Sequence, residues 1–181
     1  MEALKTVTIS KRAELAAKGG HPWIYGSEIK GKDEGIEPGE IVRVLSGKGK
    51  FIGSGFYNEH SKITVRIIST NANDRFDDAF WKRRVSYALD YRLQVMQPED
   101  YDNMRIIFGE ADQLPGLTVD RFGDVLSVQV LSLGIEKNKD IILNSLIEVL
   151  RQHGLPVSCV YERNDVKIRE LEGLTQYKGF F

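Results

Sequence analysis

The first 70 residues contain short apolar segments separated by glycine-rich turns, and this pattern limits the possible folds more than any other feature. Strands are predicted at residues 4–9, 41–45, 51–57 and 63–68. The loop 46–50 between two of these strands contains two glycines and two lysines. Closely spaced short strands joined by such turns are typical of small barrels. We therefore expect residues 1–70 to form a small β-barrel.

Two further elements are predicted in this first part. A short helix is expected at residues 11–18, because Ser10 can cap its start and the Gly19-Gly20 pair can end it. An extended segment is expected at residues 21–26, since Pro22 disfavours the helical conformation in the residue before it.

The remainder of the chain predicts a different architecture. A helix is expected at 77–96, capped by Asp77 or Asp78, and residues 71–100 are assigned to a linker with this helix. Residues 101–181 are expected to form a small domain of antiparallel strands covered on one face by a helix. The strands are predicted at 104–108, 117–121, 125–131, 157–161 and 166–169, and the helix at 136–152. The fold class is therefore α+β.

A basic cluster lies near the start of the helix predicted at 77–96. It consists of Lys82, Arg83 and Arg84. Positive charge there opposes the helix dipole, so either a solvent-exposed helix face or an external contact could explain it.

Composition excludes several classes of protein. The 181 residues have a formal net charge of −1 and a single cysteine, Cys159. A disulfide within the chain and a cysteine-based metal cluster are therefore excluded. His21, His60 and His153 lie in three different predicted elements, so no metal site is expected. No segment approaches the ~20 apolar residues of a membrane span, and we expect a soluble, cytoplasmic protein.

The segment 109–124 is unusually rich in charge for a connection between strands. Four carboxylates, Glu110, Asp112, Asp120 and Asp124, surround a Leu-Pro-Gly turn. They could form a general acid/base pair, as in a glycosidase. Carboxylates beside glycine and proline more commonly accept hydrogen bonds in turns, so a structural network that includes an Asp120–Arg121 pair is favoured.

Residues for a cofactor or a nucleophile are not evident. The glycine pairs Gly47/Gly49 and Gly53/Gly55 do not have the third glycine of a dinucleotide loop, and neither pair opens a helix. Cys159 lies in a predicted strand, where a packed and inert thiol is expected. We therefore assign no catalytic residue.

Several motifs, in order along the whole chain, resemble one family. It comprises bacterial class I S-adenosylmethionine (SAM)-dependent methyltransferases with an N-terminal PUA domain, similar to the ribosomal RNA large subunit methyltransferase I group, which forms 5-methylcytosine in 23S rRNA. The matching segments are His21-Pro22-Trp23-Ile24-Tyr25-Gly26, residues 39–42, residues 58–66, residues 109–117, residues 120–124, residues 161–165 and residues 170–174.

The resemblance implies that residues 1–70 are a PUA-like RNA-binding domain and that ribosomal RNA is the partner. The small excess of basic residues in this part is compatible with that role. The candidate RNA-binding residues are His21, Trp23, Lys48, Lys50, Asn58, His60, Lys62 and Arg66. Because carboxylates repel phosphates, the acidic segment is expected instead to fix its loop or to face another domain. The residues assigned to this network are Glu110, Asp112, Asp120 and Arg121.

In that family a Rossmann-like domain follows, with the SAM-binding loop and a nucleophilic cysteine. These features are absent from the 181 residues, so the chain is expected to be a truncated piece that binds no SAM and is inactive by itself. A catalytic domain would then be a second partner. Two alternatives stay open: a complete, non-enzymatic adaptor that binds RNA or the ribosome, and an acid/base hydrolase that uses the carboxylates of 109–124. The target nucleotide and the oligomeric state do not follow from the sequence.

Overall fold

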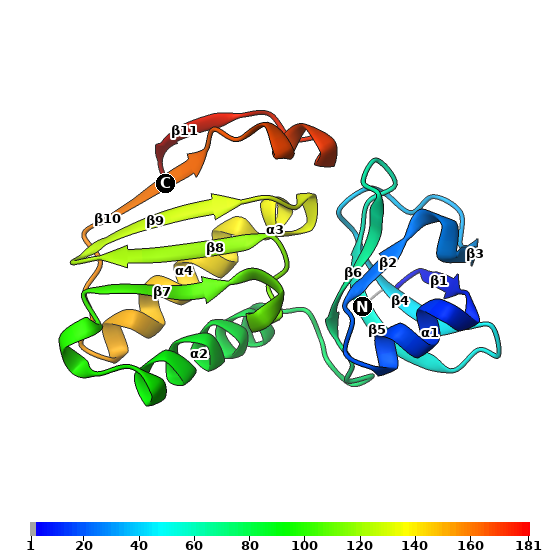
Figure 1. Cartoon of the computed structure of the whole chain (residues 1–181), viewed down its shortest axis with the longest axis horizontal. Helices are drawn as coiled ribbons and strands as arrows, with labels where there is room; N and C mark the ends of the chain where they lie inside the picture. The colour runs from blue at the N-terminus through cyan, green and yellow to red at the C-terminus, as the bar shows by residue number, and fades with distance from the viewer. Residues whose placement is uncertain (1–2) are drawn as a thin grey trace.

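A computed structural model describes residues 3–181 and contains two sheets that lie side by side (Figure 1). The first sheet is formed by the N-terminal part of the chain. The second sheet, with its helices, is formed by the remainder. The α+β fold class predicted from the sequence is confirmed.

The first sheet has six strands in the order β2-β6-β5-β4-β1-β3 and curls into a half-barrel. Neighbouring strands are antiparallel except for β1 and β4, which are parallel. Ser10 caps the helix α1, as predicted, by accepting a hydrogen bond from the Ala13 N–H at 3.1 Å. The elements are β1 (Thr6–Ile9), α1 (Lys11–Lys18), β2 (Trp23–Tyr25), η1 (Gly26–Glu28), β3 (Ile29–Lys32), β4 (Ile41–Ser46), β5 (Phe51–Tyr57) and β6 (Ile63–Ser69).

Two glycines of β5 allow the curl of this sheet. A Cβ atom on Gly53 would lie 2.8 Å from the Ser69 carbonyl oxygen, and one on Gly55 would overlap the backbone of Arg66. Glycine in a strand interior commonly marks such a close backbone approach. These glycines therefore allow β5 to pack closely against β6.

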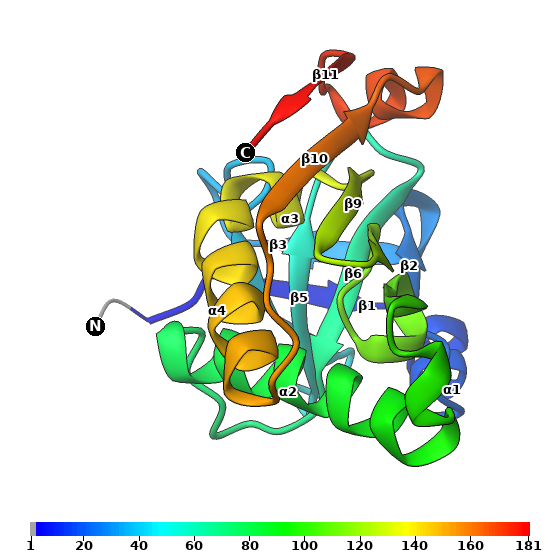
Figure 2. The ribbon, with the colours of Figure 1, turned by 90° about the vertical axis from the view of Figure 1, so that its left-hand side faces the viewer.

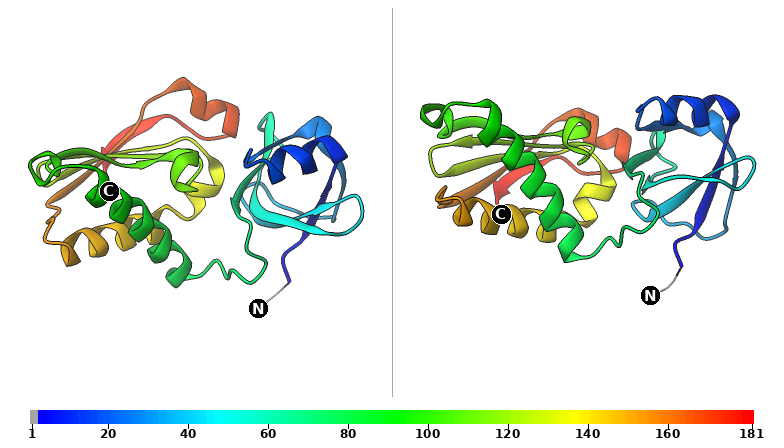
Figure 3. Two further views of the ribbon diagram at one scale, coloured as in Figure 1. Left: turned by 60° about the horizontal axis from the view of Figure 1, so that its bottom comes forward. Right: turned by 90° about the horizontal axis from the view of Figure 1, so that it is seen from below.

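The second sheet has five strands in the order β11-β10-β9-β8-β7. The helices α2 and α4 lie on the same side of it (Figure 3). The elements are α2 (Asp78–Val95), η2 (Pro98–Asp100), β7 (Asn103–Phe108), η3 (Gly109–Asp112), β8 (Leu117–Phe122), β9 (Val125–Val130), α3 (Leu133–Lys137), α4 (Lys139–Gln152), β10 (Cys159–Asn164), η4 (Lys167–Glu172) and β11 (Tyr177–Phe180).

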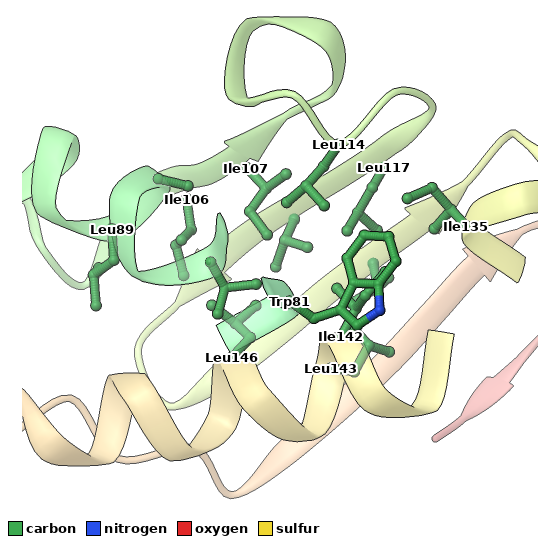
Figure 4. Close-up of a cluster of buried hydrophobic side chains, with 14 of the residues drawn as sticks. Trp81, Leu89, Ile106, Ile107, Leu114, Leu117, Ile135, Ile142, Leu143 and Leu146 are labelled. Atoms are coloured by element: carbon green, nitrogen blue, oxygen red, sulfur yellow. The ribbon is translucent and has the colours of Figure 1, made fainter. Parts of the chain in front are cut away.

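The helix α2, expected beside a linker, contributes to the core of this second unit. Its Asp77 cap is confirmed: the carboxylate accepts from the Phe80 N–H at 3.1 Å. Trp81 of α2 lies among side chains of the sheet and of α4, including Leu117 and Ile142 (Figure 4). All three of these side chains are almost completely buried.

Four details differ from the sequence-based expectation. The strands β9 and β10 are parallel, because α3 and α4 cross over between them. The helix predicted at 136–152 is two helices that meet at Asn138. In the segment 166–169, Val166 is the N-cap of the 3-10 helix η4 and residues 167–169 start it, so the segment does not form a strand. The strands β3 and β11 were not predicted, and β11 pairs antiparallel with β10 at the edge of the sheet (Figure 2).

An apolar contact joins the two units. Phe56 of β5 belongs to the core of the second unit, where its ring stacks with Trp81 at a centroid distance of 6.0 Å and an interplanar angle of 7°. Gly134 of α3 lies against the same phenyl ring, and a Cβ atom there would overlap it. The contact between the sheets therefore has no room for an additional methyl group.

We expect Gly134→Ala to lower the free energy of unfolding by roughly 1–3 kcal/mol, the usual penalty for overpacking. Denaturant unfolding measures this loss. Gly31→Ala is the matched control, because a Cβ there has no atom of residues 3–181 within 4 Å. Equal stability of the two variants would contradict the close packing around Phe56.

Candidate nucleic-acid interface

A cleft of about 400 Å³ lies between the two units. On the first unit it is lined by the residues after α1, Gly20 to Pro22, and by the end of β6, Ile67 to Thr70. On the second unit it is lined by Glu110, Ala111 and Gln113 of the segment that follows β7. Its walls combine an imidazole, a proline and isoleucines with hydroxyl, amide and carboxylate groups.

A short chain of contacts crosses this cleft. The ring of His21 meets the ring of Trp23 edge to face, with centroids 5.6 Å apart. Trp23 then donates a hydrogen bond from Nε1 to Glu110 Oε1 at 2.9 Å. His21 is exposed, whereas Trp23 and Glu110 are half-buried. Trp23 thus positions the Glu110 carboxylate at the edge of the cleft.

The wall formed by the second unit is fixed by Asp112. Its carboxylate accepts two hydrogen bonds from the Arg92 guanidinium, at 2.6 and 2.9 Å, and a third from the Phe108 N–H at 2.6 Å. The turn ends at Gln113, which has a positive φ of 56°. Such paired, bidentate contacts give geometric specificity. The loop at 109–113 is therefore a defined turn.

Arg84 of α2 connects both walls. It donates to the Ile68 carbonyl oxygen at 2.8 Å and to the side-chain oxygen of Gln113. Burial lowers the pKa of the Arg84 guanidinium from its ordinary value.

The other residues of the basic cluster also have partners within the chain. Lys82 pairs with Glu148 at 2.6 Å and Arg83 with Asp74 at 2.9 Å. These contacts explain the positive charge near the start of α2.

A second connection between the units is a buried ion pair. Arg66 of β6 donates from Nη2 to Glu172 Oε1 at 2.8 Å, and the two side chains are only 11% and 5% exposed. Asn58 adds hydrogen bonds from Nδ2 to Glu172 Oε2 at 3.1 Å and to the Glu172 carbonyl oxygen at 3.0 Å. Arg66 and Asn58, predicted to contact RNA, therefore hold η4 against the first sheet.

The remaining candidate RNA-binding residues do not gather with His21 and Trp23. Lys48 and Lys50 are exposed in the β4–β5 turn, on the side of the first sheet away from the second unit (Figure 1). His60 and Lys62 are exposed in the β5–β6 turn, beside η4. The predicted set is thus divided among three places.

The two charged residues of β8, Asp120 and Arg121, are also paired, although with other partners than predicted. Asp120 accepts two hydrogen bonds from Arg105 of β7, at 2.7 and 2.9 Å. Arg121 is buried on the opposite face, where it donates to the Pro156 carbonyl oxygen at 3.0 Å and lies 3.7 Å from Asp102. The predicted Asp120–Arg121 pair is wrong, because successive residues of a strand point to opposite faces.

The glycines, histidines and cysteine considered for a cofactor in the sequence lie in separate places of the structure. Among residues 3–181, no group of three potential ligands gathers for a metal ion. Gly47 and Gly49 lie at the β4–β5 turn, and Gly53 and Gly55 lie within β5, so neither pair presents a helix N-terminus to a ligand. Cys159 is a half-buried free thiol at the start of β10. Within the same residues no helix is long and apolar enough to cross a membrane.

Sequence reasoning missed the partners of several residues that shape the interface. Glu172 and Arg84 bind partners more than ten residues away in sequence, and Phe56 leaves the core of its own sheet. Local periodicity carries no signal for such contacts. The motif at 170–174 contains Glu172, but it did not indicate the partners of this side chain.

We expect Glu172→Ala to lower the free energy of unfolding by roughly 3–5 kcal/mol, because it leaves the Arg66 guanidinium buried without its counterion. Asp120→Ala is the matched control. It breaks a more exposed pair with Arg105 and should cost less than about 1 kcal/mol. Chemical denaturation measures both, and a Glu172→Ala loss no larger than the control would show that the pair does not hold the units together.

Comparison with known proteins identifies a matching domain family and several similar proteins. Residues 7–70 match the family described as a PUA-like domain. "Ribosomal RNA large subunit methyltransferase I" from Klebsiella pneumoniae is 32% identical over 173 residues, which are 96% of this chain and 42% of that protein. The protein of the same name from Pseudoalteromonas translucida is 35% identical over 159 residues, which are 88% of this chain and 39% of that protein.

Solved structures show the same fold at low sequence identity. A putative SAM-dependent methyltransferase from Streptococcus mutans matches with a TM-score of 0.74 and 16% identity, over 87% of this chain and 40% of that chain. A putative methyltransferase complexed with SAH matches with a TM-score of 0.73. The chain spans about two fifths of the length of these relatives. It thus contains a PUA-like domain at residues 7–70 and is homologous to a part of ribosomal RNA large subunit methyltransferase I.

Proposed function

We propose that this chain is the RNA-binding part of a SAM-dependent rRNA methyltransferase that acts on C5 of cytosine, and that it presents the RNA to a catalytic domain. The observation that carries the proposal is the cleft between His21-Pro22 and the 110–113 turn. It lies at the edge of the PUA-like domain, and the homology to rRNA methyltransferases agrees with RNA as its ligand.

The chemistry of the cleft suits one unpaired nucleotide. Its volume of about 400 Å³ is within the usual range of small-ligand pockets. The exposed His21 ring offers a stacking face, as aromatic side chains do for unstacked bases. The Glu110 carboxylate can accept a hydrogen bond from a base amino group, as Glu and Asp do from N4 of cytosine. Because the same carboxylate repels phosphates, the base would enter the cleft and its phosphates would stay outside.

The methyl transfer itself is assigned to residues outside this chain. SAM would supply the methyl group, and we assign its site to the catalytic domain. Ribosomal RNA and the catalytic domain are therefore the two proposed partners, and the paired carboxylates of 110–120 would face that domain or hold their own turn. An rRNA ligand would place the protein in the bacterial cytoplasm.

Two other functions receive less support. An adaptor that binds rRNA without chemistry would use the same cleft, and homology to methyltransferases favours the enzyme. A hydrolase would need two carboxylates free to act across an open cleft. Here Glu110, Asp112 and Asp120 are each held by a different donor: Trp23, Arg92 and Arg105. We do not propose a hydrolase.

We expect His21→Ala to weaken binding to unmodified 23S rRNA by roughly fivefold or more, because a base loses its stacking partner. Titration monitored by filter binding measures the dissociation constant. His153→Ala, which changes a histidine at the far end of α4, is the control and should bind like the wild type. An unchanged affinity of His21→Ala would show that the cleft is not part of the RNA-binding surface.

We expect the double variant Lys48→Ala/Lys50→Ala to bind more weakly and with a lower salt dependence. If each lysine contacts a phosphate, the slope of log K against log salt falls by about 1.5 in total. The same titration at several salt concentrations measures the slope. A slope equal to that of the wild type would place the β4–β5 turn outside the interface.

A further inference from the structure

The outer face of α2 carries an exposed aromatic row. Tyr87 and Tyr91 are one helical turn apart, so they lie on the same face of the helix. Phe108 at the end of β7 lines the same groove, whose volume is about 620 Å³. The three side chains are 58%, 57% and 56% exposed. Aromatic rings exposed to this degree and gathered in one groove mark an interaction site.

Arginines hold two of these rings in place. The Arg92 guanidinium lies over the Tyr91 ring at 5.2 Å, and the Arg105 guanidinium lies over the Phe108 ring at 5.1 Å. Each arginine is itself fixed by a bidentate carboxylate, Asp112 for Arg92 and Asp120 for Arg105. The rings are thus ordered before any ligand arrives, which lowers the entropy lost on binding.

The groove begins where the cleft ends. Ala111 and Gln113 line both of them, so the two hollows meet at the 110–113 turn. An RNA strand with one base in the cleft would have its neighbouring nucleotides at the edge of the groove. The charges of the groove suit such a strand, because Arg92 and Arg105 are balanced by Asp112 and Asp120 and Arg84 adds a positive charge to the lining.

We propose that the groove binds an unpaired RNA strand that continues from the cleft, with its bases stacked on Tyr91, Tyr87 and Phe108. This inference rests on the proposed function and adds a second contact site to it. Stacking on aromatic rings beside basic groups is the usual way to bind single strands with little sequence preference. A duplex does not fit this mode, because its bases are already stacked within the helix.

The test compares a fluorescent single-stranded oligoribonucleotide with a duplex of the same sequence, each titrated with the full chain. Tyr87→Ala/Tyr91→Ala should weaken single-strand binding by roughly fivefold or more for each ring lost. Tyr91→Phe keeps the ring and should bind like the wild type. Phe108→Ala should weaken binding. Phe122→Ala is its matched control, because Phe122 also lies in a strand and is 57% exposed, but does not line the groove.

The outcomes separate this inference from the proposed function. Single-strand binding that depends on His21 but not on Tyr87, Tyr91 or Phe108 would overturn the proposed role of the groove and leave the proposed role of the cleft intact. Absence of all RNA binding would overturn both. A wild-type chain that sediments as a dimer and a Tyr87→Ala/Tyr91→Ala variant that sediments as a monomer would show a protein interface instead.

Discussion

The placement of one phenyl ring determines how the two units of this protein sit together. Phe56 belongs by sequence to a strand of the first sheet, yet its side chain stacks on Trp81 in the core of the second unit. Because cores are close-packed, a shared aromatic side chain leaves little freedom to rotate one sheet against the other. The cleft, the Arg66–Glu172 pair and the Trp23–Glu110 hydrogen bond all depend on this placement.

Arginine–carboxylate pairs have different roles according to their burial. The Arg66–Glu172 pair is buried between units, where its value lies in fixing one arrangement, since burial of both charges offsets much of their attraction. The Arg105–Asp120 pair is more exposed, so it contributes little to stability. Its position beside Phe108 gives it a different effect, because the paired guanidinium orients an aromatic ring.

Local patterns in the sequence predicted most elements of this fold. The cap residues Ser10 and Asp77, the helix at 11–18 and the strands from 41 to 68 were confirmed, because each depends on neighbouring residues. The strand β11 and the parallel pairing of β9 with β10 were not predicted, since they depend on the crossover through α4 and on a distant partner. The cleft was predicted only in part. The His21-Pro22-Trp23 motif identified one wall and the basic cluster identified Arg84, whereas the contacts of Arg84 with Ile68 and Gln113 are tertiary and have no local signal.

Arg84 has a consequence for how a ligand could enter. Its guanidinium is bound to the Ile68 carbonyl on one wall of the cleft and to Gln113 on the other, and Phe56 restrains the same two units. Widening the cleft would break one of these bonds and leave a buried charge short of a partner, which is costly. The cleft therefore resists widening when a ligand enters. For the RNA ligand that we propose, the conformational adjustment would fall on the RNA, and its affinity would follow how easily a nucleotide leaves its own stack.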